Sequence, residues 1–372
     1  MATAVGESTL ERPGLVGTRL HLGATIPKLN FLRALCAAMV VLHHSGYTHL
    51  PAPFGMFAFF FISGFLITRL LLKENETLGA VSLRTFYARR ALHILPPLYV
   101  YCIIALIALT TPFYHLRIVW SEAVCCLLGV ANYYHGLHGH PYTVFSHTWF
   151  LGVEEQFYFL WPCVFVLFRR RLKNLTGLLL VVIPVIWIYR AYLGLSHVSD
   201  AYIYTSFETR ADAILVGCWF ALCIHTGIAK RLIQNISSPR YLVFTLLAIA
   251  ACVWVNEHIE HPYRDLASFT LDPLLAAALI LQLITLKGGA WMDGRVISYL
   301  GKISYSTYLY QQLVIPIMHH VLSKQAHILF SIMALFCAWG VAACSFEMIE
   351  NPFLRMKKRF SSTICAPQAM SH

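Results

Sequence analysis

The segment NFLRALCAAMVVLHHSGY (30–47) is an apolar run that carries titratable side chains. Arg33 lies near its start, and His43 and His44 lie near its end. At about 100° and 1.5 Å per residue, a helix would place Arg33 and His44 on nearly one face, roughly 16 Å apart along its axis. Because ionisable groups are costly in lipid, they usually face a protein interior or a watery cavity and mark a pathway or a reaction site. A second interpretation stays open, in which Arg33 reaches the headgroups and the histidines fill polar gaps between helices.

The composition predicts a helical membrane protein. Of the 372 residues, 58% are hydrophobic and 12% are charged, whereas a soluble globular chain has about 25% charged residues. Backbone polar groups in lipid must be satisfied within a helix or a closed barrel, and the apolar runs here are far longer than barrel strands. We therefore expect an all-α fold, a polytopic transmembrane helical bundle of about ten spans.

Connector charge predicts the orientation of that bundle. The expected spans lie near 30–49, 54–72, 91–111, 148–168, 175–194, 209–227, 241–256, 268–286, 298–320 and 327–347, and the broken run 118–133 suits an interfacial or re-entrant helix. With both termini in the cytoplasm, the inner side takes all of the 28 Lys and Arg residues except Arg117, Arg190, Arg210, Arg264 and Lys324. This asymmetry follows the positive-inside rule, and it accounts for the net charge of +11 without a nucleic-acid partner.

One membrane domain is expected. We place it at 29–353, between a polar cytoplasmic segment (1–28) and a basic cytoplasmic tail (354–372), because no internal repeat is visible. The N-terminal segment lacks the apolar core of a signal peptide, so no cleaved leader is expected.

Two polar clusters interrupt the lipid-compatible background on the inner half. In FFFISGF (59–65), Ser63 and Gly64 are small, so a neighbouring helix or a ligand can approach closely. In FYARRALHILP (86–96), Arg89 and Arg90 precede His93 at a helix start. Guanidinium groups and exposed N–H groups suit phosphate or pyrophosphate binding there, although a topology signal or headgroup contact explains the cluster equally simply.

A third cluster, HTWFLGVEEQFY (147–158), opens a span with two carboxylates. His147, Glu154 and Tyr158 fall on one helical face, so His147 and Glu154 could meet a common cavity. Intramembrane acids usually serve function. Pairing with Arg190 or Arg210 is the structural alternative.

Weaker signals complete the pattern. FETRAD (207–212) suits an ion-pair network or a substrate contact, and the hydroxyls and amides of KISYSTYLYQQ (302–312) suit sugar binding or bridges between helices. Glu350 closes the last span, where pairing with arginines is expected. HGLHGH (135–140) looks like a metal ligand set, but no cysteine or acid nearby in the sequence completes it, and no C-x-x-C pair occurs among the 11 cysteines. No metal site is expected.

Taken in order, these clusters make the chain similar to the acyltransferase-3 family of membrane-bound O-acyltransferases, of the O-acetyltransferase type, from about Asn30 to Phe353. The matching positions are Arg33 and His44, Phe60–Phe65, Arg89, Arg90 and Pro96, Trp149–Tyr158, Gly301–Leu309, and Glu350–Pro352. Asn30, Phe150, His93 and Gln311 depart from residues that are common in the family, so no catalytic role is assigned to Gln311.

The resemblance implies transfer of an acyl group, usually acetyl, from acyl-coenzyme A to a hydroxyl of a carbohydrate, a lipid-linked sugar or a secondary metabolite. Acyl-CoA would be a co-substrate, with no bound cofactor and the plasma (inner) membrane as the location. His44 is the expected base, since imidazole is poised near neutral pH, and Glu154 would orient it or bind acceptor hydroxyls. A short-lived acyl-histidine at His44 is a variant.

The remaining predicted site residues divide into two groups. For donor binding they are Arg33, Arg89, Arg90 and Ser63, and for acceptor binding or structural polar contacts they are His147, Trp149, Glu155, Tyr158, Arg210, Ser304, Tyr305 and Tyr308. The alternative function is a secondary transporter or exporter of a small or acylated metabolite, with the buried charges as a proton relay.

Overall fold

The computed structural model describes residue 26 and residues 28–47, 52–111, 120–258, 263–321 and 327–362. Helices account for most of these residues and no strand occurs among them, which confirms the all-α prediction. The predicted cytoplasmic segment 1–28 lies almost entirely outside the described residues, as does the end of the predicted tail. The helix α16 (Asn351–Ser362) runs across the predicted boundary at 353–354.

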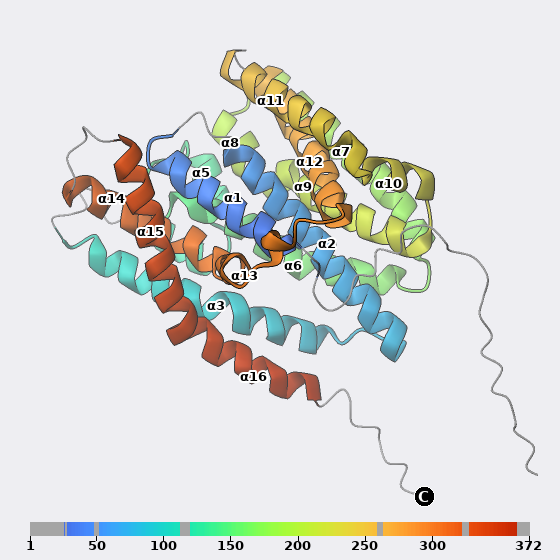
Figure 1. The fold of residues 1–372 in the computed structure, drawn as a ribbon, viewed down its shortest axis with the longest axis horizontal. Coiled ribbons are helices and arrows are strands. Elements are labelled where there is room, and N and C mark those ends of the chain that lie inside the picture. The colour runs from blue at the N-terminus through green and yellow to red at the C-terminus, as the bar shows by residue number, and fades with distance from the viewer. Residues whose placement is uncertain are drawn as a thin grey trace, which may run out of the picture.

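The helices follow one another with short connections (Figure 1). In chain order before α16 they are α1 (Leu29–His44), α2 (Ala52–Leu78), α3 (Leu83–Ala108), α4 (Trp120–Leu127), α5 (Ala131–Leu137), α6 (Trp149–Phe168), α7 (Leu172–Leu195), α8 (Asp200–Thr205), α9 (Phe207–Thr226), α10 (Lys230–Ile236), α11 (Leu242–His258), α12 (Tyr263–Thr285), α13 (Arg295–Lys302), α14 (Ser304–Val321) and α15 (His327–Ser345). A π-helical turn, Phe346–Glu350, joins α15 to α16.

Seven helical segments of the described chain are long and apolar enough to cross a membrane. They are Phe54–Leu78, Leu83–Ala108, Ser146–Phe168, Leu172–Leu195, Pro239–Asn256, Ala267–Thr285 and Ile328–Met356. Each of the ten expected runs overlaps a helix, but α1 is shorter and α9 and α14 are more polar than a lipid-facing span. The chain is a multi-pass membrane protein, while ten spans and cytoplasmic termini stay predictions.

Two expected segments differ in detail. The run 298–320 is not one helix, because the chain turns at Ile303 between α13 and α14, and Figure 1 shows α13 nearly end-on. The broken run 118–133 forms the short helices α4 and α5, as its interrupted apolar pattern indicates; 118 and 119 lie outside the described residues.

The helices α2 and α9 touch backbone to backbone. A Cβ atom on Gly64 of α2 would lie 2.0 Å from the carbonyl oxygen of Ile214, and one on Gly217 of α9 would lie 2.2 Å from that of Phe61. Only glycine fits at either position, which confirms the predicted close approach of a neighbouring helix at Gly64. The neighbouring Ser63 is thereby turned to another side of α2.

The helix α1 lies in the middle of the bundle, between α2, α13, α14 and α15 (Figure 1). Its start is fixed by α13, because a Cβ on Gly301 would lie 2.2 Å from the carbonyl oxygen of Asn30. The backbone N–H of Lys28 donates to the Asp293 carboxylate at 2.7 Å. These contacts set the rotation of α1 and therefore the direction in which Arg33 and His44 point.

Candidate functional site

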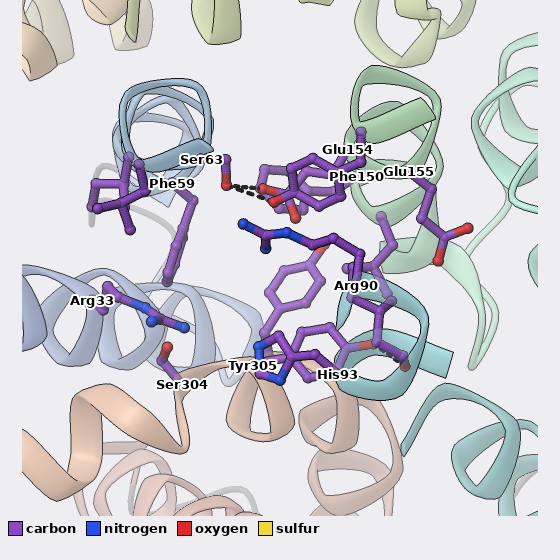
Figure 2. Close-up of a pocket in the computed structure, with 16 residues that line it drawn as sticks. Arg33, Phe59, Ser63, Arg90, His93, Phe150, Glu154, Glu155, Ser304 and Tyr305 are labelled. Carbon is purple, nitrogen blue, oxygen red and sulfur yellow. Dashed lines mark hydrogen bonds between the residues drawn. The ribbon is translucent and has the colours of Figure 1, made fainter. Parts of the chain in front are cut away.

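Five helices enclose a cavity at the centre of the bundle (Figure 2). We call it the arginine cavity; it has a volume of about 120 Å³. It is lined by Arg33 of α1, Phe59, Ile62, Ser63 and Leu66 of α2, Arg90, His93 and Ile94 of α3, Phe150, Leu151, Glu154, Glu155 and Tyr158 of α6, and Ser304, Tyr305 and Tyr308 of α14. Motifs far apart in the sequence thus meet at one place.

Two guanidinium groups enter this cavity from different helices. Figure 2 shows Arg33 and Arg90 pointing inward from α1 and α3. The Arg90 guanidinium carbon lies 4.8 Å from the centroid of the Tyr158 ring. Within the described parts of the chain, neither arginine forms an ion pair with a carboxylate, although both interact electrostatically with Glu154. Their hydrogen-bond donors remain available to an anion.

Glu154 is positioned by α2. Ser63 donates a hydrogen bond from its Oγ to the Glu154 carboxylate, and the Tyr158 hydroxyl donates to Ser63 Oγ at 3.0 Å. In Figure 2 the neighbouring Glu155 turns away from the arginines. Its Oε2 lies so close to Gly129 that a Cβ there would be 2.5 Å away. Glu154 is therefore the carboxylate that faces the cations.

Only one of the paired arginines of α3 lines the cavity. Consecutive helical residues point about 100° apart, so Arg89 cannot face the same side as Arg90. The Arg89 side chain is half-buried, and its Nε has no hydrogen-bond partner among the described residues. The predicted donor contact of Arg89 is thus not part of this cavity.

His44 lies in a second cavity, of about 80 Å³, which we call the histidine cavity. It is lined by Val40, His43, His44, Met56, His140, Ser146, His147, Trp149, Tyr204, Tyr308 and Gln312. Both cavities have room for several water molecules or a small acyl group. Arg33 and His44 share a face of α1, as predicted, yet they open into different cavities.

The partner of His44 is an amide instead of the expected carboxylate. His44 Nδ1 lies 3.2 Å from Gln311 Oε1, and no hydrogen bond joins His44 to Glu154 in the described structure. The oxygen of Gln311 accepts, so His44 Nδ1 carries the hydrogen and Nε2 keeps its lone pair. We predicted no catalytic role for Gln311 from the sequence. Its position one helical turn after Tyr308 was the signal that could have identified it as a residue of the site.

Three of the predicted acceptor residues, His147, Trp149 and Tyr308, line the histidine cavity, so His147 does not share a cavity with Glu154. His147 Nε2 donates to the Leu309 carbonyl at 3.0 Å, and the Tyr308 hydroxyl donates to the His147 carbonyl at 2.5 Å. The Trp149 ring packs against Tyr204, with centroids 4.8 Å apart. These contacts give the histidine cavity an aromatic wall beside its four imidazoles.

Of the three remaining predicted residues, Arg210 and Tyr305 contact other helices, whereas the Ser304 hydroxyl has no hydrogen-bond partner among the described residues. Arg210 lies behind the aromatic wall, with its guanidinium carbon 3.5 Å from the Phe269 ring centroid and its Nε donating to the Tyr204 carbonyl at 2.6 Å. Tyr305 donates from its hydroxyl to the Ile94 carbonyl at 3.1 Å and thereby joins α14 to α3. Ser304 lies beside Arg33 in Figure 2.

Of the charges near the start of α9, Asp212 forms an ion pair with Arg190 of α7, whereas Glu208 accepts hydrogen bonds from the hydroxyls of Tyr133 and Tyr202. Arg190 Nη1 lies 3.1 Å from the Asp212 carboxylate and also donates to the Thr209 carbonyl. Arg190 therefore does not pair with Glu154. Glu350 is fully buried and accepts a hydrogen bond from Ser306.

A buried acid that the sequence did not single out lies beside the histidine-rich loop. Glu122 Oε1 lies 3.2 Å from His135 Nε2 and accepts from the Thr143 hydroxyl. Burial raises the pKa of Glu122 to about 7 and lowers that of His135 to about 3. In the described part of the chain, no group of three or more such ligands could hold a metal ion.

Comparison with known proteins identifies the family of the chain. The acyltransferase domain model of the acyltransferase-3 family matches residues 26–346. Peptidoglycan O-acetyltransferase OatA of Listeria monocytogenes is 26% identical over 353 residues, which cover 88% of this chain and 55% of the relative. O-acetyltransferase OatA of Staphylococcus aureus is 24% identical over 365 residues, 93% of this chain and 60% of the relative.

The chain thus spans less than two thirds of the length of these relatives. No solved structure matches it. The family model covers most of the chain and includes every residue that lines the two cavities. The chain belongs to the acyltransferase-3 family.

Proposed function

We propose that the protein is an O-acyltransferase of the plasma membrane that moves an acyl group, acetyl by preference, from acyl-CoA to a hydroxyl. A carbohydrate is the acceptor that fits best, because one relative is a peptidoglycan O-acetyltransferase. A lipid-linked sugar or a small metabolite would present the same hydroxyl chemistry.

One observation carries the proposal: two unpaired guanidinium groups lie in a cavity next to an imidazole whose Nε2 is available. Arg33 and Arg90 offer the hydrogen-bond geometry that phosphate oxygens of coenzyme A require. His44, oriented by Gln311, is the group that can take a proton from an alcohol near neutral pH.

The proposed reaction is balanced as follows. His44 Nε2 takes the proton of the acceptor hydroxyl while the hydroxyl oxygen attacks the thioester carbonyl carbon. The C–O bond forms and the C–S bond breaks, and the coenzyme A thiolate receives the proton back from the imidazolium. In the acyl-histidine variant, His44 Nε2 attacks the thioester carbonyl carbon, so that a C–N bond forms and coenzyme A leaves as the thiolate. The acceptor hydroxyl then attacks the acyl-imidazole, the C–N bond breaks, and the hydroxyl proton passes to the thiolate.

Replacing His44 tests the proposal. Membranes with wild-type protein, His44→Ala or His225→Ala receive acetyl-CoA labelled in the acetyl group, and labelled product and intact thioester are measured. His225 is the matched control because it pairs with Glu76, 3.4 Å away, and lines neither cavity.

We expect His44→Ala to lose at least about 100-fold in transfer, the effect of a missing general base, at unchanged expression. Full activity of His44→Ala would contradict the assignment. A wild-type protein that leaves the thioester whole would contradict the proposed reaction and agree with the transport alternative.

A further inference from the structure

Tyr308 stands between the two cavities. Among the described residues it is the lining residue that the arginine cavity and the histidine cavity share. Tyr308 belongs to α14, and its side chain is buried in the protein. Gln311 and Gln312 follow it in the same helix. Tyr308 thus borders both the cavity that holds the arginines and the cavity that holds His44.

The ring is held on both sides. Its centroid lies 5.4 Å from that of Phe150, which lines the arginine cavity, and 5.3 Å from that of His147, which lines the histidine cavity. The hydroxyl donates to the His147 carbonyl at 2.5 Å. One hydrogen bond and two ring contacts thus fix the phenol between the two cavities.

This placement conflicts with direct reaction in the structure as it stands. A thioester held by Arg33 and Arg90 lies on one side of the ring, and His44 Nε2 lies on the other. Transfer requires the reacting groups to come within about 3.5 Å of each other. The ring must move before an acyl group reaches His44.

We propose that Tyr308 is the partition between a donor site in the arginine cavity and an acceptor site in the histidine cavity. In the resting protein the phenol keeps water and hydroxyls of the acceptor side away from the thioester. When the acyl group passes, the hydroxyl releases the His147 carbonyl and the ring turns aside. The inference rests on the proposed function and deepens it.

Such a partition protects the thioester of the donor from hydrolysis. Water is also a hydroxyl nucleophile, and an open path between the cavities would let it take the acyl group without acceptor. The reaction that Tyr308 suppresses is hydrolysis of the thioester to a carboxylate and free coenzyme A, in which one water supplies both the OH and the proton.

The test compares Tyr308→Ala and Tyr308→Phe with Tyr310→Ala. Tyr310 is the matched control because it is buried in the same helix, packs on Tyr101 with centroids 5.6 Å apart, and lines neither cavity. For each purified protein, free coenzyme A is measured with and without acceptor, and acetylated acceptor is measured in parallel. Binding of acetyl-CoA, followed by thermal shift, reports that the variant is folded.

We expect Tyr308→Ala to raise the ratio of hydrolysis to transfer at least tenfold. Tyr308→Phe keeps the ring and loses only the hydrogen bond, so its ratio should rise by a smaller factor, and Tyr310→Ala should leave the ratio unchanged. An unchanged ratio in Tyr308→Ala, or a parallel fall of both rates, would overturn the partition. If Tyr308→Ala does not bind acetyl-CoA, the ratio of hydrolysis to transfer in Tyr308→Phe is the test instead. An unchanged ratio in that variant would overturn the partition.

The two proposals fail differently. Absence of transfer in the wild-type protein would count against the proposed function. Transfer in the wild-type protein with an unchanged ratio in the Tyr308 variants would leave that function standing and remove the partition alone.

Discussion

Replacing Arg90 by Gln should weaken donor binding far more than the same change at Arg89. The structure separates these neighbours, because Arg90 lines the arginine cavity and Arg89 does not. The Arg90 guanidinium rests on the Tyr158 ring and forms no hydrogen bond to another described residue, so an anion would gain its donors without breaking an existing contact.

The magnitude follows from that geometry. A hydrogen bond to a charged group contributes about 1.5–3 kcal/mol, and ~1.4 kcal/mol corresponds to a factor of ten in affinity. Arg90→Gln should therefore raise the KM for acetyl-CoA roughly 10- to 150-fold. Arg89→Gln removes a charge outside the contact, and we expect a change of less than about fivefold.

The assay is an acetyl-CoA titration of purified protein at fixed acceptor, with KM and kcat separated. Arg90→Lys is a third variant; it keeps the charge and loses the planar fork of donors, so its KM should lie between wild type and Arg90→Gln. A KM that stays unchanged in Arg90→Gln, or that rises more in Arg89→Gln, would refute the placement of the donor phosphates.

Three other expectations follow from single contacts. Gln311→Leu removes the acceptor of His44 Nδ1, a hydrogen bond of about 1 kcal/mol, and should lower kcat several-fold with little change in donor KM; an unchanged kcat would contradict the role of the amide. Gly217→Val places side-chain atoms against the α2 backbone and should cost about 1–3 kcal/mol or more, visible as a lower melting temperature, whereas Gly177→Val, which meets no neighbour, should not. Because burial raises the pKa of Glu122 from 4.5 to about 7, the folded protein loses stability as pH rises through that interval, up to about 3 kcal/mol. Glu122→Gln should therefore melt higher than wild type at about pH 8 and near it at about pH 5, and a pH-independent difference would contradict this.

Much of the site was predictable because polar side chains within a membrane-spanning helix are costly in lipid and therefore face the protein interior. Arg33, Ser63, Arg90 and Glu154 each interrupt an apolar run, and the cost of facing hydrocarbon forces all of them toward one interior. The helices that carry them are also found where the apolar runs predict. Convergence on a common cavity follows from these two facts.

The rotation of each helix was not predictable to the same degree. A helix that is apolar on all sides has no polar face to define its orientation, so adjacent residues such as Arg89 and Arg90 look equivalent in sequence. Packing decides between them. The contact of Gly301 with the Asn30 backbone, for example, joins segments far apart in the chain.

The division into two cavities was the least predictable feature. The spacing of Arg33 and His44 predicts that they share one face of α1, but it does not predict which residues of other helices lie opposite that face. The ring of Tyr308 reaches that face from α14, and the amide of Gln311 comes with it. Neither a period nor a motif in α1 carries information about them.

The glycine contact between α2 and α9 has a mechanical consequence. The backbones of α2 and α9 are in direct contact at Gly64 and Gly217, so the two helices cannot slide past each other without a steric clash. They therefore form one rigid unit. Ser63 belongs to this rigid unit. The movement proposed for Tyr308 would therefore take place on the α14 side of the arginine cavity, while the α2 side stays fixed.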